Sequence, residues 1–173
     1  TDGYRENNEY RVQDLGGKIV FDPTDRLSLN LSGSLHADEY GLPGDLSEQE
    51  FRRDPEASND PFDEAETTDR YVKIGFGLDL RQWGLLTADL SYRARENKSK
   101  YPDASFPFES ESEIDTVGVT PRHVWEGRIG GHRNKLIVGC DIYWTDQEIK
   151  SSTGLFTPVV SPSGRDTIER STF

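Results

Sequence analysis

Residues 27 to 37 read Leu27-Ser28-Leu29-Asn30-Leu31-Ser32-Gly33-Ser34-Leu35-His36-Ala37, with every odd position apolar or glycine and every even position polar. A period of two suits one face of a β-strand, whereas a helix groups its residues at a period of about 3.6. The alternation continues for eleven residues. An ordinary strand has about five or six residues, and a strand that crosses a bilayer needs about 9 to 11. The stretch predicts a strand long enough to span a membrane.

The same alternation recurs along the chain. In residues 70–80, for example, Val72, Ile74, Phe76 and Leu78 fall on one face. The predicted strands are 9–21, 26–37, 70–80, 85–96, 113–127 and 135–149, and the tail at 167–173 is a candidate start of a seventh. Pro121 lacks the N–H that a ladder needs, so we expect a bulge or local irregularity there. His123 falls on the apolar face by strict alternation, and a bulge at Pro121 would change that.

The connections between these strands alternate in length. Short turns are expected at 22–25, 81–84 and 128–134, and long polar loops at 38–69, 97–112 and 150–165. Bacterial outer-membrane barrels have short periplasmic turns and long external loops. The sequence therefore predicts an all-β, antiparallel up-and-down meander that forms part of a transmembrane barrel. The alternative is a soluble antiparallel sheet or sandwich, in which the same apolar residues face a protein core.

Composition is compatible with a barrel that has a wet interior. Of the 173 residues, 32% are hydrophobic and 30% charged, and the mean hydropathy is −0.77. A net charge of −12 and a pI near 4.7 argue against nucleic-acid binding, which needs a basic surface. The sequence contains no run of 18 apolar residues, so it predicts no transmembrane helix. The chain begins Thr1-Asp2-Gly3 and contains no methionine, so we expect an internal piece of a longer protein.

Several segments resemble the barrel of TonB-dependent outer-membrane receptors. They are Leu27-Ser28-Leu29-Asn30-Leu31 leading to Asp38-Glu39-Tyr40-Gly41-Leu42-Pro43-Gly44, Tyr92-Arg93-Ala94-Arg95-Glu96-Asn97-Lys98, Val117-Gly118-Val119-Thr120-Pro121-Arg122 and Leu136-Ile137-Val138-Gly139-Cys140-Asp141-Ile142-Tyr143. The resemblance covers most of the chain, but each motif is a loose pattern and none is a catalytic signature.

This resemblance implies a barrel of about 22 strands, of which the chain would supply roughly a third. It also implies a plug domain and a short box that contacts TonB, neither of which occurs in these residues. Members of the family import nutrients such as ferric siderophores, haem or cobalamin. The resemblance thus implies an outer-membrane location in a Gram-negative bacterium, with outer-membrane lipid, the plug, TonB and a small nutrient as partners, and no nucleic acid.

No catalytic constellation is found, and no cofactor or metal is expected. The sequence has no phosphate-binding glycine loop, no Gly-x-Ser-x-Gly and no His-Glu-x-x-His. His36 and Asp38 share a strand face and were considered as metal ligands, but a solvated histidine inside a barrel fits this pattern better. Cys140 is the one cysteine, and it is expected to pack as a small hydrophobe.

The predicted loop 38–69 holds twelve acidic and two basic residues, Arg52 and Arg53, giving a charge of −10. Such a segment is usually solvated and disordered, although clustered carboxylates also attract cations. Because recognition residues usually lie on loops, we expect ligand contacts at this end. The expected ligand-binding residues are Tyr40, Asp60, Asp63, Glu64, Glu66, Arg93 and Arg95, although charge pairing across strands is an alternative role for both arginines.

The function that this pattern favours is nutrient binding and uptake across the outer membrane with energy from TonB, and not an enzymatic reaction. Two alternatives stay open. One is a soluble secreted or periplasmic all-β binding module, and the other is a porin-like barrel that does not use TonB.

Overall fold

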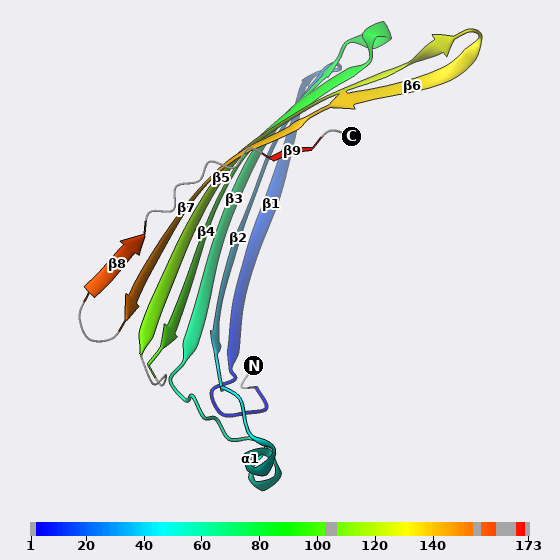
Figure 1. The fold of residues 1–173 in the computed structure, drawn as a ribbon. Coiled ribbons are helices and arrows are strands. Elements are labelled where there is room, and N and C mark those ends of the chain that lie inside the picture. Colours follow the sequence, from blue (N-terminus) through cyan, green and yellow to red (C-terminus); the bar gives the residue numbers. More distant parts are fainter. Residues whose placement is uncertain (1–2, 103–106, 154–156, 162–168, 172–173) are drawn as a thin grey trace.

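A computed structural model describes residues 3–102, 107–153, 157–161 and 169–171. Nearly all of the described elements are strands, as Figure 1 shows. They are β1 (Tyr10–Thr24), β2 (Leu27–Gly41), β3 (Glu64–Asp79), β4 (Leu85–Tyr101), β5 (Phe108–Ile129), β6 (His132–Gly139), β7 (Asp141–Thr153), β8 (Thr157–Ser161) and β9 (Glu169–Ser171). The described helices are α1 (Glu48–Arg53) and the single-turn 3₁₀ helix η1 (Arg81–Trp83). None of the described helices is long and apolar enough to cross a bilayer.

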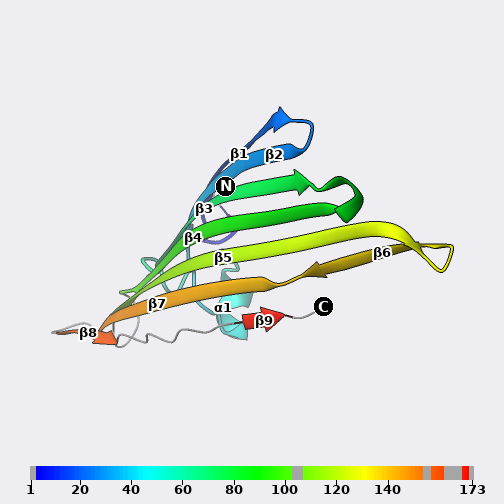
Figure 2. The ribbon, with the colours of Figure 1, turned by 90° about the horizontal axis from the view of Figure 1, so that it is seen from above.

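The strands form one antiparallel sheet in chain order, β1-β2-β3-β4-β5-β7-β8. All strand pairs among the described residues are antiparallel, and from β1 to β5 each strand pairs with the next in the sequence. β6 and β7 both pair with β5, and β8 and β9 both pair with β7. In Figure 2 the strands lie side by side from β1 to β7, and the described sheet stays open. The predicted all-β meander is confirmed. Of the predicted tail strand, residues 169–171 form β9, which pairs with β7.

One continuous apolar face runs across the sheet. Directly opposite residues of an antiparallel pair share a face, so the register decides which residues do. Leu31 pairs with Ile74, Ile74 with Leu90, Leu90 with Val119 and Val119 with Ile142. The apolar residues that the alternation groups together in each predicted strand therefore lie on one face of the sheet. β1 adds Leu15, Ile19 and Phe21 to this face.

The described part of the chain does not cover this apolar face. Leu31 is 47% exposed, Ile74 56% and Leu90 51%, and Ala65 is the buried hydrophobic residue found among the described residues. A soluble sandwich needs a second layer that covers such a face. The described residues form a single sheet, so they supply no such second layer.

The strands are longer at the loop end than the alternation predicted. β2 continues to Gly41, β3 begins at Glu64, β4 continues to Tyr101 and β5 begins at Phe108. The predicted loops 38–69 and 97–112 therefore shrink to 42–63 and 102–107. Part of the predicted loop 150–165 is strand as well, since β7 continues to Thr153 and β8 pairs with it. Residues 103–106, 154–156 and 162–168 lie outside the described residues.

The missed strand ends are charged on the face that is apolar elsewhere. Ion pairs cross the strands here, from Lys100 Nζ to Glu64 at 2.8 Å, from Lys98 Nζ to Glu111 at 3.3 Å and from Lys150 Nζ to Glu113 at 3.1 Å. Because both faces are polar at these ends, the sequence shows no period of two there and predicts a loop.

The first predicted turn is displaced by an irregularity in β1. The β1–β2 register shifts by one residue between Phe21 and Thr24, around Pro23. The strand therefore continues to Thr24, whose hydroxyl accepts hydrogen bonds from the N–H groups of Arg26 and Leu27 at 3.3 and 3.1 Å. The turn lies at 25–26 and not at 22–25, because Pro23 is accommodated by the bulge of an edge strand.

At Pro121 the structure has the expected local irregularity, but it is not a bulge in β5. The β4–β5 register runs unbroken from Leu85 to Tyr101, and β6 and β7 continue one another along β5 with an interruption at Cys140, opposite Pro121. The Cys140 N–H donates to the Pro121 carbonyl at 3.2 Å, and proline has no N–H to return the bond. The missing N–H of Pro121 therefore interrupts the facing strand at Cys140, between β6 and β7, and β5 itself stays regular. His123 therefore stays on the apolar face, where its Nε2 donates to the Trp83 carbonyl at 2.7 Å.

The connections are sorted by end, as the meander requires. The turns at 25–26, 80–84 and 130–131 lie at one end of the sheet, which we call the turn end. The connections 42–63 and 102–107 leave the opposite end, the loop end (Figure 1). A marked difference in length is found only for 42–63, since the strands extend into the other two predicted loops.

Candidate functional site

A row of charged side chains crosses the polar face of the sheet near the loop end. The register places Asp14 of β1 opposite His36 of β2, His36 opposite Asp69 of β3, and Asp69 opposite Arg95 of β4. Opposite Cβ atoms lie about 4.5–5.5 Å apart. Alternation in four separate strands therefore brings four ionisable groups within reach of one another, and we call this set, with Arg93 and Asp38, the charge network.

Asp69 is the centre of the charge network. Arg93 Nε donates to its two carboxylate oxygens at 2.9 and 3.0 Å, and Arg93 Nη2 donates to Oδ2 as well. Arg95 Nε lies 3.3 Å from the same Oδ2. The Asp69 side chain is only 10% exposed. A nearly buried carboxylate between two guanidinium groups is well paired, and the forked geometry fixes the direction of Arg93.

His36 extends the charge network to β1. Its Nδ1 lies 2.7 Å from Asp14 Oδ1, and its Nε2 lies 3.0 Å from Asp38 Oδ2. An imidazole can donate to carboxylates at both nitrogens only when both carry a proton. His36 and Asp38 do share a face, as predicted, and they are joined by a hydrogen bond. No group of three or more His, Cys, Asp or Glu side chains that could hold a metal ion is found in the described residues.

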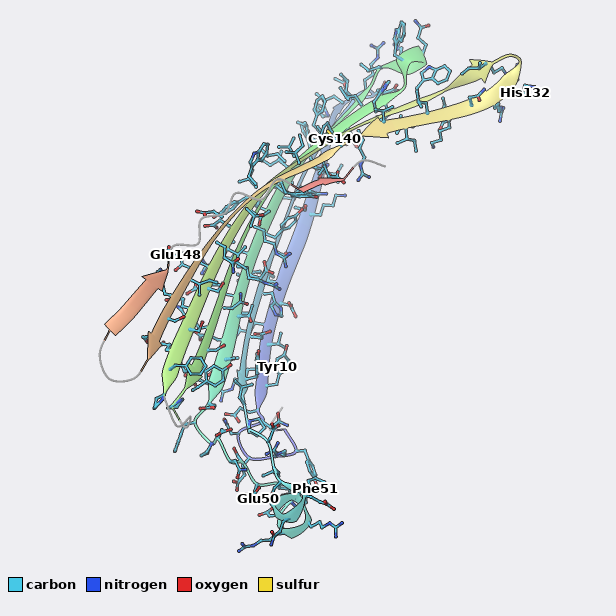
Figure 3. All side chains as sticks on the ribbon, viewed as in Figure 1. Tyr10, Glu50, Phe51, His132, Cys140 and Glu148 are labelled. Carbon is cyan, nitrogen blue, oxygen red and sulfur yellow. The ribbon has the colours of Figure 1, made fainter. Side chains whose placement is uncertain are left out.

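The long loop 42–63 contains a short helix and accepts hydrogen bonds from Arg5 and Asn7, which its composition did not indicate. Its helix α1 begins after Ser47, whose hydroxyl and N–H donate to the Glu50 carboxylate at 2.6 and 2.8 Å. These two bonds lower the pKa of Glu50 and form a capping box with the Glu50 N–H, which donates back to the Ser47 hydroxyl. Glu50 and Phe51 lie at the loop end, and His132 lies in the β5–β6 hairpin at the turn end (Figure 3).

The expected ligand residues do not form one cluster. Tyr40 ends β2 on the polar face, with its ring 6.3 Å from that of Tyr10. Asp60 and Asp63 lie in the loop, and Asp63 is 5% exposed. Arg93 and Arg95 lie in the charge network, farther along the polar face.

Glu64 and Glu66 lie on the opposite face of the sheet from Tyr40. They belong to β3 and alternate with Ala65, which pairs with Tyr40. Glu64 accepts a hydrogen bond from Lys100 Nζ at 2.8 Å, and this carboxylate raises the pKa of Lys100. The structure thus places Tyr40, Asp60, Asp63 and Glu64 at the loop end. Glu64 and Glu66 leave the opposite face of the sheet from Tyr40, although Glu64 and Tyr40 line one hollow.

Sequence reasoning missed the residues that order the loop. Arg5 and Asn7 precede β1 and donate hydrogen bonds to backbone carbonyls of residues 43–63. Nothing in the sequence indicates this, because the acceptors are main-chain atoms about 40 to 55 positions away. The sequence predicts a loop at Asp69, whereas Asp69 lies in β3 and pairs with Arg95 of β4.

No family model matches the sequence, and no curated protein matches it. Among solved structures, the crystal structure of the ferric citrate transporter FecA in its unliganded form is similar, with a TM-score of 0.76 at 18% identity. The match covers 94% of this chain and 25% of the transporter chain, so this chain spans about a quarter of that length. At this identity the likeness shows the fold alone, which is of the barrel type.

Proposed function

We propose that the chain is part of an outer-membrane receptor that binds a small nutrient at the loop end and imports it with energy supplied through TonB. The observation that carries this proposal is the pairing of an uncovered apolar face with a polar, charge-paired face on one long-stranded sheet. A transmembrane barrel needs this arrangement, because its outer face meets lipid and its inner face meets water or protein.

The height of the apolar belt supports a membrane role. The belt on β2 extends from Leu27 to Leu35, which is about 27 Å along the strand and about 21 Å at a tilt of about 40°, near the roughly 25 Å of outer-membrane barrels. Tyr92 and Trp144 lie on this face at its loop-end border. The Tyr92 hydroxyl donates to Asp115 at 2.7 Å, in the first charged row beyond the belt. Aromatic residues with one apolar and one polar side suit such a border.

The polar face supports a receptor that encloses other protein. Its charges are paired across strands, as in the charge network and in Lys73 with Asp89, whose Nζ and Oδ2 are 3.2 Å apart. We infer that a plug domain faces these groups and that TonB is contacted through another part of the full-length protein. Nutrient recognition is assigned to the loop end, with Tyr40, Asp60, Asp63, Glu64, Glu66, Arg93 and Arg95 as the candidate residues.

The test is uptake by the full-length protein in cells that lack their other iron and cobalamin receptors. Four probes cover the proposed nutrient class: ferric citrate, a ferric trihydroxamate siderophore, haem and cyanocobalamin. We expect saturable uptake of one of them, abolished when TonB is deleted. Uptake that persists without TonB would identify a porin-like barrel, and absence of uptake for all four probes would contradict the proposal.

A further inference from the structure

Residues 3–9, which we call the strap, are fastened to the loop 42–63. The guanidinium group of Arg5 donates four hydrogen bonds to three different backbone carbonyls of the loop. Nη1 donates to Gly44 at 2.7 Å and Nη2 to Pro43 at 3.1 Å, while Nε and Nη2 both donate to Ala57 at 3.1 and 3.0 Å. One side chain thus joins the beginning of the loop to its later part.

Asn7 makes the second fastening. Its Nδ2 donates to the carbonyls of Asp60 and Asp63 at 2.7 and 2.8 Å. Its backbone φ of 53° lies in the left-handed region, which asparagine tolerates better than most residues. Two main-chain bonds flank it, from the Glu6 N–H to the Glu56 carbonyl at 2.7 Å and from the Gly41 N–H to the Glu9 carbonyl at 3.1 Å.

The strap passes so close to β2 that the position beneath it must be glycine. A Cβ on Gly41 would lie 2.4 Å from both the backbone oxygen and Oδ1 of Asn7. Contacts under about 3.0 Å are not tolerated by a real Cβ, so a side chain here would push the strap away. Gly41 is buried, and it offers a way to loosen the strap without removing any hydrogen-bonding side chain.

The strap and the loop together enclose a hollow of about 250 Å³ at the end of β2. Its walls include Asn7 and Glu9 from the strap, Tyr40 from β2, and Pro61 and Phe62 from the loop. The Phe62 side chain is 70% exposed. Because both the strap and the loop line the hollow, together with residues of the sheet, its shape depends on where the strap holds the loop. Tyr40, a candidate ligand residue, lies in this wall.

We propose that the strap is a latch that positions the loop 42–63 for nutrient recognition, with Arg5 and Asn7 as its positioning residues. This inference rests on the proposed function, since it assigns a role to the same loop end. The loop carries seven acidic residues and two arginines, a composition that favours a disordered chain. Holding it in one conformation before the nutrient arrives reduces the entropy lost on binding.

The test compares strap variants of the full-length protein in outer membranes. Arg5→Lys keeps the charge but loses the planar guanidinium that donates to three carbonyls. Asn7→Asp keeps the size of the side chain but removes its N–H donors. Gly41→Ala adds a Cβ that displaces the strap. Trypsin cleavage after Arg52 or Arg53, both exposed in α1, reports loop opening. We expect each variant to be cut at least about tenfold faster than the parent, the effect of losing roughly one hydrogen bond. Arg122→Ala is the control, because the exposed Arg122 makes an ion pair with Asp141 at 3.7 Å, in the part of β5 that lies toward the turn end.

The second measurement is the concentration dependence of uptake, which shows whether the conformation of the loop affects nutrient binding. For whichever of the four probes the parent transports, the half-saturating concentration should rise at least about fivefold in Asn7→Asp, with unchanged maximal rate and protein level. Arg5→Lys should lie between Asn7→Asp and the parent. Unchanged cleavage in all three variants would overturn the latch, and faster cleavage with unchanged half-saturation would overturn its role in recognition. If the parent transports none of the four probes, the proposed function has failed, while cleavage still decides the latch.

Discussion

Arg93 and Asp69 form a forked ion pair between adjacent strands, with Arg93 Nε 2.9 and 3.0 Å from the two carboxylate oxygens. Arg95 contacts the same carboxylate. Replacing Asp69 by Asn therefore leaves two neighbouring cations without their shared anion. We expect Asp69→Asn to lower the free energy of unfolding by about 1–3 kcal/mol, measured by urea unfolding of the full-length protein in lipid vesicles.

The control for this change is Asp89→Asn. Asp89 pairs with Lys73 alone, at 3.2 Å, and both side chains are about one-third exposed. An exposed single pair contributes less than about 1 kcal/mol. An equal loss of unfolding free energy in the two variants would mean that the charge network stabilises the protein no more than an exposed ion pair does.

A charge on the apolar belt should disturb folding only when a bilayer surrounds it. Leu31 lies in the middle of the β2 belt and is 47% exposed in the chain itself. We expect Leu31→Arg to destabilise the protein in lipid vesicles by about 2–4 kcal/mol, the cost of arginine near the bilayer midplane. The matched control is Ser34→Arg, an exposed position on the polar face of the same strand. If both substitutions have the same effect, the apolar face does not meet lipid.

Two strand glycines on the polar face should respond differently to alanine. A Cβ on Gly118 would lie 2.6 Å from Ser91 Oγ and from the Tyr143 ring, whereas a Cβ on Gly77 would have its nearest neighbour at 3.7 Å, on Ser28. We expect Gly118→Ala to reduce the free energy of unfolding by about 1–3 kcal/mol through overpacking. Gly77→Ala should change it by less than about 0.5 kcal/mol. Urea unfolding in vesicles measures both, and a neutral Gly118→Ala would show that Tyr143 does not pack on this glycine.

A donor restored at position 121 should close the break between β6 and β7. Cys140 donates to the Pro121 carbonyl at 3.2 Å, and no N–H returns the bond. Pro121→Val supplies this N–H and suits a strand, so we expect a gain of about 0.5–1.5 kcal/mol in stability. Hydrogen exchange at Cys140 and Asp141 should slow in the variant. Unchanged exchange would mean that proline does not cause the interruption.

The meander and the belt could be predicted from the sequence because lipid and water impose opposite demands on alternate residues. The period of two in Leu27 to Leu35 survives as one face of β2, and its counterparts in other strands fall on the same face. The strand ends could not be predicted. Beyond Leu35 and Val72, both faces meet polar surroundings, so residues such as Glu66 and Lys98 carry no alternation that would distinguish strand from loop.

The candidate site could be predicted only in part. Alternation placed Arg93 and Arg95 on the polar face, and the register confirms that position. It could not show that Asp69 pairs with both, because the partner depends on the register between strands. The contacts of the strap could not be predicted for a different reason. Arg5 and Asn7 donate to backbone carbonyls, which every residue of the loop has whatever its side chain.

Shortening the loop 42–63 should impair uptake without preventing barrel assembly. Replacing residues 46–58 by a short Gly/Ser linker removes α1 and most of the loop carboxylates but leaves β2 and β3 complete. The control shortens the opposite end by deleting Gly127, Arg128, Arg133 and Asn134, which removes two paired rows of the β5–β6 hairpin and keeps its Gly130-Gly131 turn. We expect both proteins to reach the outer membrane in a heat-modifiable form. Uptake of the transported probe should fall at least about tenfold for the loop variant alone, since recognition is placed on loops that a rigid scaffold carries. Unchanged uptake would leave the loop without a role in recognition, and failed assembly would make it structural.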